Sequence, residues 1–401
     1  MGRTATARQP RDWPAFVWSV GEEGSDPVVD VDGVDFRHDQ YEQSGHYNHM
    51  DADLRAIASL GVEVVRHGMP WRLTEPEPGV YDWTLWDRAF AACNDAGLTP
   101  VVDLLHFGLP DHFGGFADRA WVDGFCRYVD ALLARYPEPL WFTPINEPGI
   151  TATMSARWGV WNDRLATPHD HARVLSNIVL ANLEALARIQ ADRNGLWISS
   201  EGFDVYVDPT GTSPQKVERR QAVSWLAWDL HLGHDPLPAA AEYLDVIDDD
   251  IRSRIAELAM SDDLIAGLDF YPTSVQSVAG PAPQWSIAER IHHGMTAMSA
   301  WHDRYRQPFW ISETSNLTLP ISEQVPWLTQ LVAGLDALAH DGLPVRGVCW
   351  YSRGDQYDWQ TALTKPTGAV TEVGLFDTKR VARPVATTLQ QFVSAHSARN
   401  D

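Results

Sequence analysis

Short runs of apolar residues recur along the whole chain, and most of them end in a polar or ionisable residue. Apolar runs of about four to eight residues that lie between Gly, Pro or Asp residues are typical of buried β-strands. The pattern predicts eight strands, at residues 15–20, 62–67, 99–106, 140–145, 196–201, 264–271, 309–312 and 345–350.

Longer segments between these runs repeat apolar residues at every third or fourth position, which is the spacing of an amphipathic helix. Several of these segments stop at a glycine, which readily adopts the left-handed conformation that ends a helix. The pattern predicts helices at residues 48–60, 84–96, 120–136, 169–194, 217–232, 245–260, 288–305, 322–341 and 384–395.

Strands that alternate with helices indicate βαβ units and a parallel sheet. Eight such units that close on themselves form a (β/α)₈ TIM barrel, which places the active site at the C-terminal ends of the strands. An open, doubly wound sheet is the alternative, but the loop after the first strand, Gly21–Gly24, is acidic and would repel a phosphate. We therefore expect one barrel over residues 13–398, preceded by a flexible tail over residues 1–12.

Composition narrows the classes of partner. The 401 residues include 31 basic and 54 acidic side chains, a net charge of −23, which argues against nucleic acid or an anionic membrane. Cys93, Cys126 and Cys349 are odd in number and lack metal-binding spacing, so we expect free thiols in a reducing compartment. The first residues lack the apolar core of a secretory signal, and we expect a cytoplasmic protein.

Polar side chains gather at the predicted strand ends, and in a barrel these ends meet at one mouth. Burying so many ionisable groups together is costly, so their convergence indicates a function. The residues at these ends are Arg66, His67, His106, Asn146, Glu147, Glu201, Asp269, Tyr271, Glu313 and Trp350.

Two of these residues, Glu147 and Glu313, suit the cleavage of a glycosidic bond. Retaining glycosidases use one protonated carboxyl to assist the leaving group and one ionised carboxylate, about 5–5.5 Å away, to attack the sugar. Arg66 would hold Glu313 ionised by its opposite charge, and Tyr271 could donate a hydrogen bond to the same carboxylate. Asn146 is placed to bind a sugar hydroxyl beside the reacting carbon.

At these residues the sequence resembles the family 1 glycoside hydrolases, which belong to a large clan of barrel enzymes. The family's Thr-x-Asn-Glu-Pro motif is present as residues 143–148, and its nucleophile motif is similar to residues 311–315. The resemblance covers roughly residues 15–395. It implies that Glu147 is the acid/base, that Glu313 is the nucleophile and that Asn146 binds the sugar's 2-hydroxyl.

Other family positions are matched with substitutions. The resemblance implies that further residues bind the substrate, namely His106, Asp269, Trp350, Asp358 and Trp359. The strand-one Gln of the family has no clear counterpart, and its glycone-binding Glu is an Asp here. Residues 77–83 also resemble other families of the clan, such as families 42 and 5, so the catalytic machinery is better defined than the sugar.

Each of these residues also has a plainer interpretation. Asn146-Glu147-Pro148 could be the turn that starts a helix, and Glu201 competes with Glu313 but fits better as a supporting or rim carboxylate. His292, His293 and His302 lack converging ligands, and we interpret them as surface residues.

We expect a retaining, exo-acting β-glycosidase of the β-glucosidase kind that acts on a small soluble β-glycoside, with no cofactor and no metal. Two alternatives stay open. One is a non-catalytic sugar-binding barrel, and the other is a transglycosidase that uses the same residues. The oligomeric state does not follow from the sequence.

Overall fold

The computed structural model describes residues 13–260, 262–280 and 282–400. The tail that we predicted over residues 1–12 lies outside these described residues. Within them, no helix combines the length and the apolar character needed to cross a lipid bilayer.

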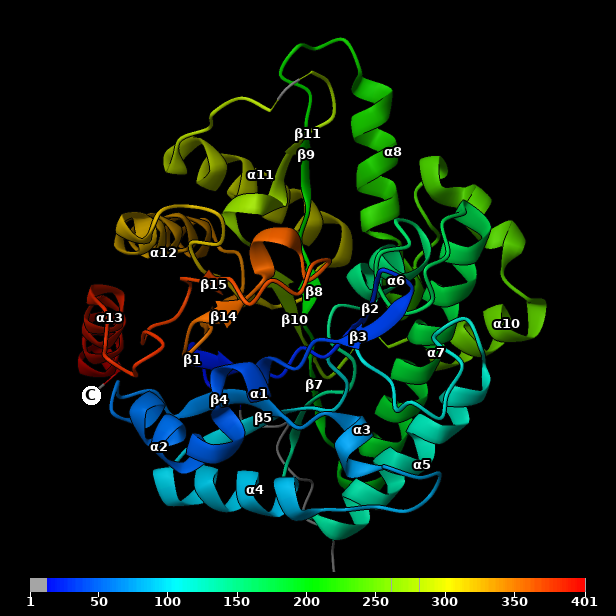
Figure 1. Ribbon diagram of the computed structural model, residues 1–401. Helices are drawn as coiled ribbons and strands as arrows, with labels where there is room; N and C mark the ends of the chain where they lie inside the picture. Colours follow the sequence, from blue (N-terminus) through cyan, green and yellow to red (C-terminus); the bar gives the residue numbers. More distant parts are fainter. Residues whose placement is uncertain (1–12, 261, 281, 401) are drawn as a thin grey trace, which may run out of the picture.

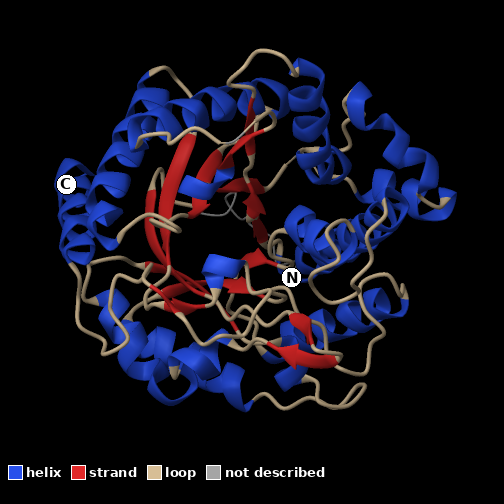
Figure 2. Cartoon of the chain, turned by 45° about the horizontal axis from the view of Figure 1, so that its top comes forward, coloured by secondary structure: helices blue, strands red, loops and turns tan. Residues whose placement is uncertain are grey.

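Eight parallel strands form a closed ring, with β12 pairing with both β10 and β13. Figure 2 shows this ring of strands in the interior with helices around it, which confirms the predicted (β/α)₈ barrel. In order around the ring the strands are β1 (Val17–Glu22), β4 (Val64–Gly68), β5 (Thr99–Asp103), β6 (Trp141–Thr143), β7 (Leu196–Ile198), β10 (Leu264–Asp269), β12 (Phe309–Glu313) and β13 (Val345–Tyr351).

The helices occupy most of the predicted segments (Figure 1). They are α2 (His46–Ala58), α4 (Thr84–Ala96), α5 (Ala120–Arg135), α7 (Pro168–Arg193), α10 (Asp249–Leu258), α11 (Ile287–Tyr305), α12 (Gln324–His340) and α13 (Pro384–Asn400). The segment predicted at 217–232 is two helices, α8 (Pro214–Ser224) and α9 (Leu226–Leu232). Three further helices were not predicted: α1 (Gln40–Ser44), α3 (Trp71–Thr74) and α6 (Pro148–Ala156).

The loops contain further short strands and 3₁₀ helices. Two-stranded pairings join β2 (Val28–Val31) to β3 (Val34–Arg37), β9 (Val205–Val207) to β11 (Val275–Ser277), and β14 (Gln356–Tyr357) to β15 (Val370–Thr371), while β8 (Glu201–Gly202) extends the edge of β10. The 3₁₀ helices are Pro238–Val246, Pro272–Ser274, Ile321–Glu323 and Trp359–Thr361. All of these strand pairs follow barrel strands in the chain, so they build up the end of the barrel at which those strands finish.

Every second side chain of a strand points into the barrel, and these inward side chains form layers along the barrel axis. One layer is apolar, and the next, closer to the C-terminal ends of the strands, is polar. A buried cluster of Val17, Val64, Val101, Leu196, Ile198, Ile265, Trp310 and Cys349 fills the apolar layer. Two residues beyond Val64 comes Arg66, and two beyond Val101 comes Asp103. Residues two apart on a strand point to the same face, so Arg66 and Asp103 also point into the barrel. The polar layer therefore lies next to the apolar one, on the side of the C-terminal strand ends.

A substitution at Gly267 on β10 would test how closely the barrel strands pack. A Cβ added there would lie 1.8 Å from the Ser199 carbonyl oxygen and 2.3 Å from Ser312 Oγ. We expect Gly267→Ala to lower the free energy of unfolding by about 3 kcal/mol or more, because backbone cannot move aside cheaply. Urea denaturation measures the change. Gly354→Ala is the control, since nothing lies within 4 Å of its added Cβ, and equal stability of the two variants would contradict the prediction.

Candidate active site

A cavity of about 440 Å³ opens at the C-terminal ends of the barrel strands. Six of the predicted site residues line it: His106, Glu147, Asp269, Tyr271, Glu313 and Trp359. A larger hollow of about 880 Å³ lies at the beginnings of β5 and β6, and Glu138 is the one carboxylate that lines it. Of these two, only the cavity at the strand ends brings several carboxylates together, namely Glu147, Asp269 and Glu313, with Asp204 at its wall.

Glu313 is the last residue of β12, and both of its carboxylate oxygens accept hydrogen bonds from protein donors. The Tyr271 hydroxyl donates to Oε2 at 2.7 Å, and Arg66 Nη1 donates to Oε1. Both contacts match the prediction from the sequence. Two fixed donors hold the carboxylate in one orientation and stabilise its negative charge.

Arg66 lies behind the cavity wall and is fully buried. Its Nη2 donates to Asp103 Oδ2 at 2.8 Å and to Asn146 Oδ1 at 2.5 Å. Its guanidinium therefore connects four barrel strands or their ends. A planar guanidinium with several donors is suited to this bridging, which a lysine could not reproduce.

His106 has a partner at each ring nitrogen. Nδ1 lies 2.9 Å from Asp103 Oδ2, and Nε2 lies 3.2 Å from Asn146 Nδ2. Because a carboxylate accepts and an amide NH₂ donates, the contacts assign a neutral ring with its proton on Nδ1. Asn146 is fully buried behind His106, so its predicted bond to a sugar hydroxyl stays a prediction.

Glu147 sits at the junction of β6 and α6, with φ 40° and ψ 63°. Left-handed backbone is unfavourable for a residue with a side chain and persists where neighbouring structure enforces it. Here the Glu147 N–H donates to the Ser200 carbonyl at 3.0 Å, and Pro148 starts α6. The plainer interpretation of this motif as a helix start is thus also correct, and that start aims Glu147 at the cavity.

Burial raises the pKa of Glu147 well above its ordinary value, and the negative charges of Asp269, Glu313 and Glu201 raise it further. Asp269, at the end of β10, accepts hydrogen bonds from the hydroxyls of Ser200 and Ser312. Burial and the charge of Glu313 raise the pKa of Asp269 to about 7. The site therefore carries protons on some of its carboxyls at neutral pH.

Glu201 lies beside Glu147 and faces the start of α6. Its carboxylate accepts hydrogen bonds from the backbone N–H groups of Gly149 at 2.9 Å and Gly202 at 3.0 Å. Burial nevertheless raises the pKa of Glu201 to about 8. These contacts agree with a supporting carboxylate.

Two residues that we expected at the substrate lie elsewhere. Trp350 is fully buried, and its indole N–H donates to the Val373 carbonyl at 3.0 Å, whereas the neighbouring Tyr351 lines the cavity. Successive side chains of a strand point to opposite faces, so the assignment of Trp350 was one residue too early.

Asp358 is also fully buried, and it accepts hydrogen bonds from the backbone N–H groups of residues 367–369. Its carboxylate organises its own loop and does not line the cavity, which corrects the prediction of a glycone ligand. Trp359 does line the cavity, as predicted. Its buried indole nitrogen has no hydrogen-bond partner among the described residues.

Glu23 is a site residue that the sequence did not single out. Its side chain is fully buried, and Oε1 lies 3.2 Å from the same Arg66 Nη1 that binds Glu313. Burial outweighs the charge of Arg66 and raises the pKa of Glu23 well above its ordinary value. We had placed this acidic segment in a rim loop, but β1 continues two residues further than predicted and carries the segment inside.

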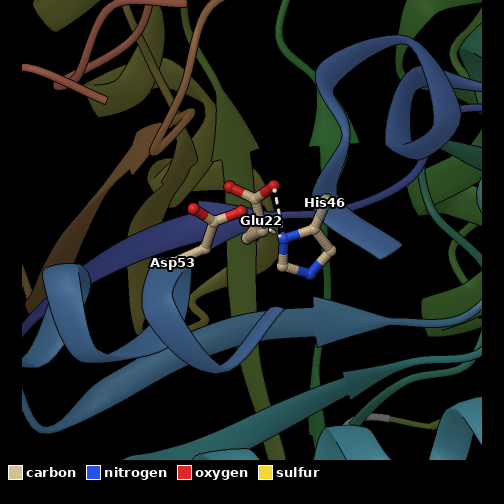
Figure 3. Close-up of side chains that lie close together, drawn as sticks. All are labelled: Glu22, His46 and Asp53. Carbon is tan, nitrogen blue, oxygen red and sulfur yellow. Dashed lines mark hydrogen bonds and ion pairs between the residues drawn. The ribbon is translucent and has the colours of Figure 1, made fainter. Parts of the chain in front are cut away.

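Next to Glu23 in the sequence, Glu22 converges with His46 and Asp53 (Figure 3). His46 Nδ1 lies 3.3 Å from Glu22 Oε1 and 3.0 Å from Asp53 Oδ2, a spacing that one metal ion could bridge. Arg353 already pairs with both carboxylates, at 2.7 Å and 3.1 Å, and Arg380 pairs with Asp53 at 2.8 Å. Because these guanidinium groups neutralise the carboxylates, we interpret the cluster as a buried ion-pair network.

Comparisons with known proteins identify the family to which the chain is similar. The sequence profile described as glycosyl hydrolase family 1 matches residues 34–263, more than half of the chain. Beta-glucosidase 1B of Phanerodontia chrysosporium is 23% identical, over 88% of this chain and 77% of its own. Coniferin beta-glucosidase of Pinus contorta is 22% identical, over 96% and 86%.

Solved structures give the same fold. A family 1 β-glucosidase from Exiguobacterium antarcticum superposes with a TM-score of 0.80 at 16% identity, covering 96% of this chain and 98% of that one. A family 1 β-glucosidase from Thermotoga maritima in complex with isofagomine lactam gives 0.79 at 17%, covering 95% and 98%.

The raised pKa values of the buried carboxyls predict how stability depends on pH. Between the ordinary carboxyl pKa and the raised values of about 7 for Asp269 and about 8 for Glu201, these two carboxyls hold more protons in the folded protein than in the unfolded chain. Stability therefore falls as pH rises through this window. We expect a melting temperature several degrees lower at pH 8.5 than at pH 5.5, and a smaller difference in Glu201→Gln. Calorimetry measures both, with exposed Glu63→Gln as the control. A melting temperature that rises over this range would refute the assignment.

Proposed function

Since the chain belongs to glycosyl hydrolase family 1, as its motifs predicted, we propose that it is a retaining, exo-acting β-glycosidase that cleaves a small soluble β-glycoside by double displacement. It is a glycoside hydrolase of the β-glucosidase kind. One observation carries the proposed mechanism. The cavity holds a carboxyl whose pKa is raised, Glu147, and a carboxylate bound by two donors, Glu313.

In the first step, a Glu313 oxygen attacks the anomeric carbon while the bond from that carbon to the leaving oxygen breaks. Glu147 gives its proton to that oxygen, and the aglycone leaves as a neutral alcohol. The raised pKa of Glu147 keeps the proton available near neutral pH. The product is a glycosyl ester on Glu313.

Esterification removes the negative charge of Glu313, which is one of the causes of the raised pKa of Glu147. Glu147 then becomes a stronger acid, and its ionised form can act as a base. In the second step it takes a proton from water, the oxygen of that water bonds to the anomeric carbon, and Glu313 leaves as a carboxylate. Arg66 and Tyr271 stabilise that carboxylate as it forms again.

The remaining residues of the site hold the sugar. His106 lines the cavity. Asn146 does not line it, but it adjoins His106, and the second hydrogen of its amide would suit the 2-hydroxyl beside the reacting carbon. Trp359 lines the cavity and offers an aromatic ring against which a sugar can pack. A cavity of about 440 Å³ suits a small glycoside. The three cysteines are buried and unpaired, which supports a place in the cytoplasm.

Removing either catalytic carboxyl group should nearly abolish hydrolysis. We expect Glu147→Gln and Glu313→Gln each to lower kcat for an unactivated β-glycoside by about 10²-fold or more. Chromogenic glycosides that differ in the sugar identify the substrate, and circular dichroism checks the fold. Glu63→Gln, far from the cavity on the surface, should keep full activity. Full activity in either catalytic variant would exclude the proposed pair.

Stereochemistry and covalent labelling test the mechanism separately. Proton NMR of early product should show the β-anomer, because two displacements restore the starting configuration. A 2-deoxy-2-fluoro glycoside slows the second step, and mass spectrometry should find the label on Glu313. An α-anomer would overturn double displacement, and a label on Glu201 would reassign the nucleophile. Transfer of the sugar to an added alcohol in preference to water would favour the transglycosidase alternative.

A further inference from the structure

A second, smaller pocket of about 120 Å³ adjoins the catalytic cavity on the side of Glu147. The two share wall residues, including Ile150, Trp158 and Gly202. Its other walls come from α6, α7, α8, β9 and β11, and Figure 1 shows α8 standing beside β9 and β11. We name it the side pocket.

Two arginines line the side pocket, and neither has a carboxylate at ion-pair distance among the described residues. Arg157 follows the last residue of α6, and Arg220 lies on α8 with its guanidinium 5.7 Å from the centre of the Tyr206 ring. Neither forms an ion pair within the part of the chain that the structure describes. By contrast, Arg72 and Arg353 near the catalytic cavity each pair with two carboxylates.

The acidic groups of the side pocket leave these charges only partly compensated. The pKa of Glu201 is raised to about 8 by burial, so this carboxyl is mostly neutral at pH 7. Asp204 is ionised at that pH. Burial raises its pKa to about 6, while hydrogen bonds from Tyr206 and Gln276 and the nearby charge of Arg220 lower it. Two positive charges and one negative charge remain, in a chain whose net charge is −23.

A buried histidine adds an unused polar atom. His171 lines the side pocket and is 1% exposed, and its Nδ1 has no hydrogen-bond partner among the described residues. Burial and the charge of Arg157 lower its pKa to about 3, so the ring is neutral and supplies no charge of its own. A ligand group could use this nitrogen.

The position of the side pocket identifies which part of a substrate would enter it. Glu147 must reach the oxygen of the leaving group, so the aglycone lies on the side of Glu147. Gly149, two residues further along the chain, lines the side pocket. Trp158, which is 58% exposed, and Tyr206 offer flat aromatic faces there.

We propose that the side pocket binds a carboxylate carried by an aromatic aglycone, with Arg157 and Arg220 as its partners. The inference rests on the proposed function, and it names the class of substrate for that site. A guanidinium binds a carboxylate through paired, charge-assisted hydrogen bonds, and the aromatic faces suit an aryl ring. Arg157 and Arg220 are specificity residues and take no part in bond cleavage.

A pair of substrates tests this directly. The two are aryl β-glycosides of the accepted sugar that carry either a carboxylate or a carboxamide at the same ring position. The carboxamide draws electrons more strongly and makes the better leaving group, so chemistry alone favours the neutral compound. We expect kcat/KM for the carboxylate to be at least tenfold higher, and the ratio to fall in high salt because ions screen the charges.

Variants assign the preference to the side pocket. Arg157→Gln and Arg220→Gln should each lower the ratio of carboxylate to carboxamide several-fold, and the double variant should bring it to one or below. Arg127→Gln, an exposed arginine of α5 outside both pockets, should leave the ratio unchanged. A wild-type ratio of one or less, or a ratio that the arginine variants do not move, would overturn the proposal.

A binding measurement separates this proposal from the proposed function. Calorimetry of both glycosides with the Glu147→Gln protein reports affinity without turnover, and tighter binding of the carboxylate is expected. Hydrolysis of the carboxamide with equal affinities would leave the glycosidase proposal intact and overturn this one. If the carboxylate binds more tightly but the wild-type protein hydrolyses neither compound, the carboxylate site is supported and the glycosidase proposal is overturned.

Discussion

The buried guanidinium of Arg66 is the contact on which the site depends. It donates to Glu313, Asp103 and Asn146, and a fourth group, Glu23, lies 3.2 Å from it. A single positive charge thus compensates carboxylates on several strand ends at once. In a low-dielectric interior, loss of such a partner leaves buried charges uncompensated, which costs far more than an exposed ion pair contributes. The geometry of Glu313 is therefore inseparable from the assembly of the barrel.

The positive charges near Arg66 are too few to neutralise all the carboxyl groups around it. Bound protons neutralise the remaining carboxyls. The pKa values of Glu23 and Glu147 are raised well above the ordinary range, and those of Asp269 and Glu201 reach about 7 and about 8, with burial as the largest cause in each case. A protonated carboxyl is neutral and can donate a hydrogen bond, so a crowded site of this kind can fold. It also supplies what acid-assisted bond cleavage needs, a carboxyl that holds its proton near neutral pH.

The parts of the fold that local pattern determines were predictable from the sequence. The helix over 84–96 has the predicted limits because Gly97 ends it, and all eight barrel strands follow apolar runs. Glu313, Tyr271 and Arg66 were placed correctly because strand ends converge in any barrel. Glu23 was missed because no local signal in the sequence shows that β1 continues two residues further. Trp350 was chosen instead of Tyr351 because the sequence alone does not show which of two successive side chains points into the barrel. A helix start at Pro148 was only an alternative interpretation, and α6 itself was missed, because the left-handed backbone of Glu147 before it is enforced by the barrel.

The two sides of the cavity are built in different ways, and this difference bears on where specificity can arise. Glu313 stands on a barrel strand and is held by groups that other strands supply, so its surroundings cannot change without disturbing the barrel. Glu147 immediately precedes a helix. The cavity wall beside it is formed by segments inserted after the barrel strands, such as β9 and β11, which pair although they lie far apart in the sequence. Such added elements can vary while the scaffold stays intact. The surroundings of Glu313 are thus fixed by the barrel, whereas those of Glu147 depend on the elements added to it.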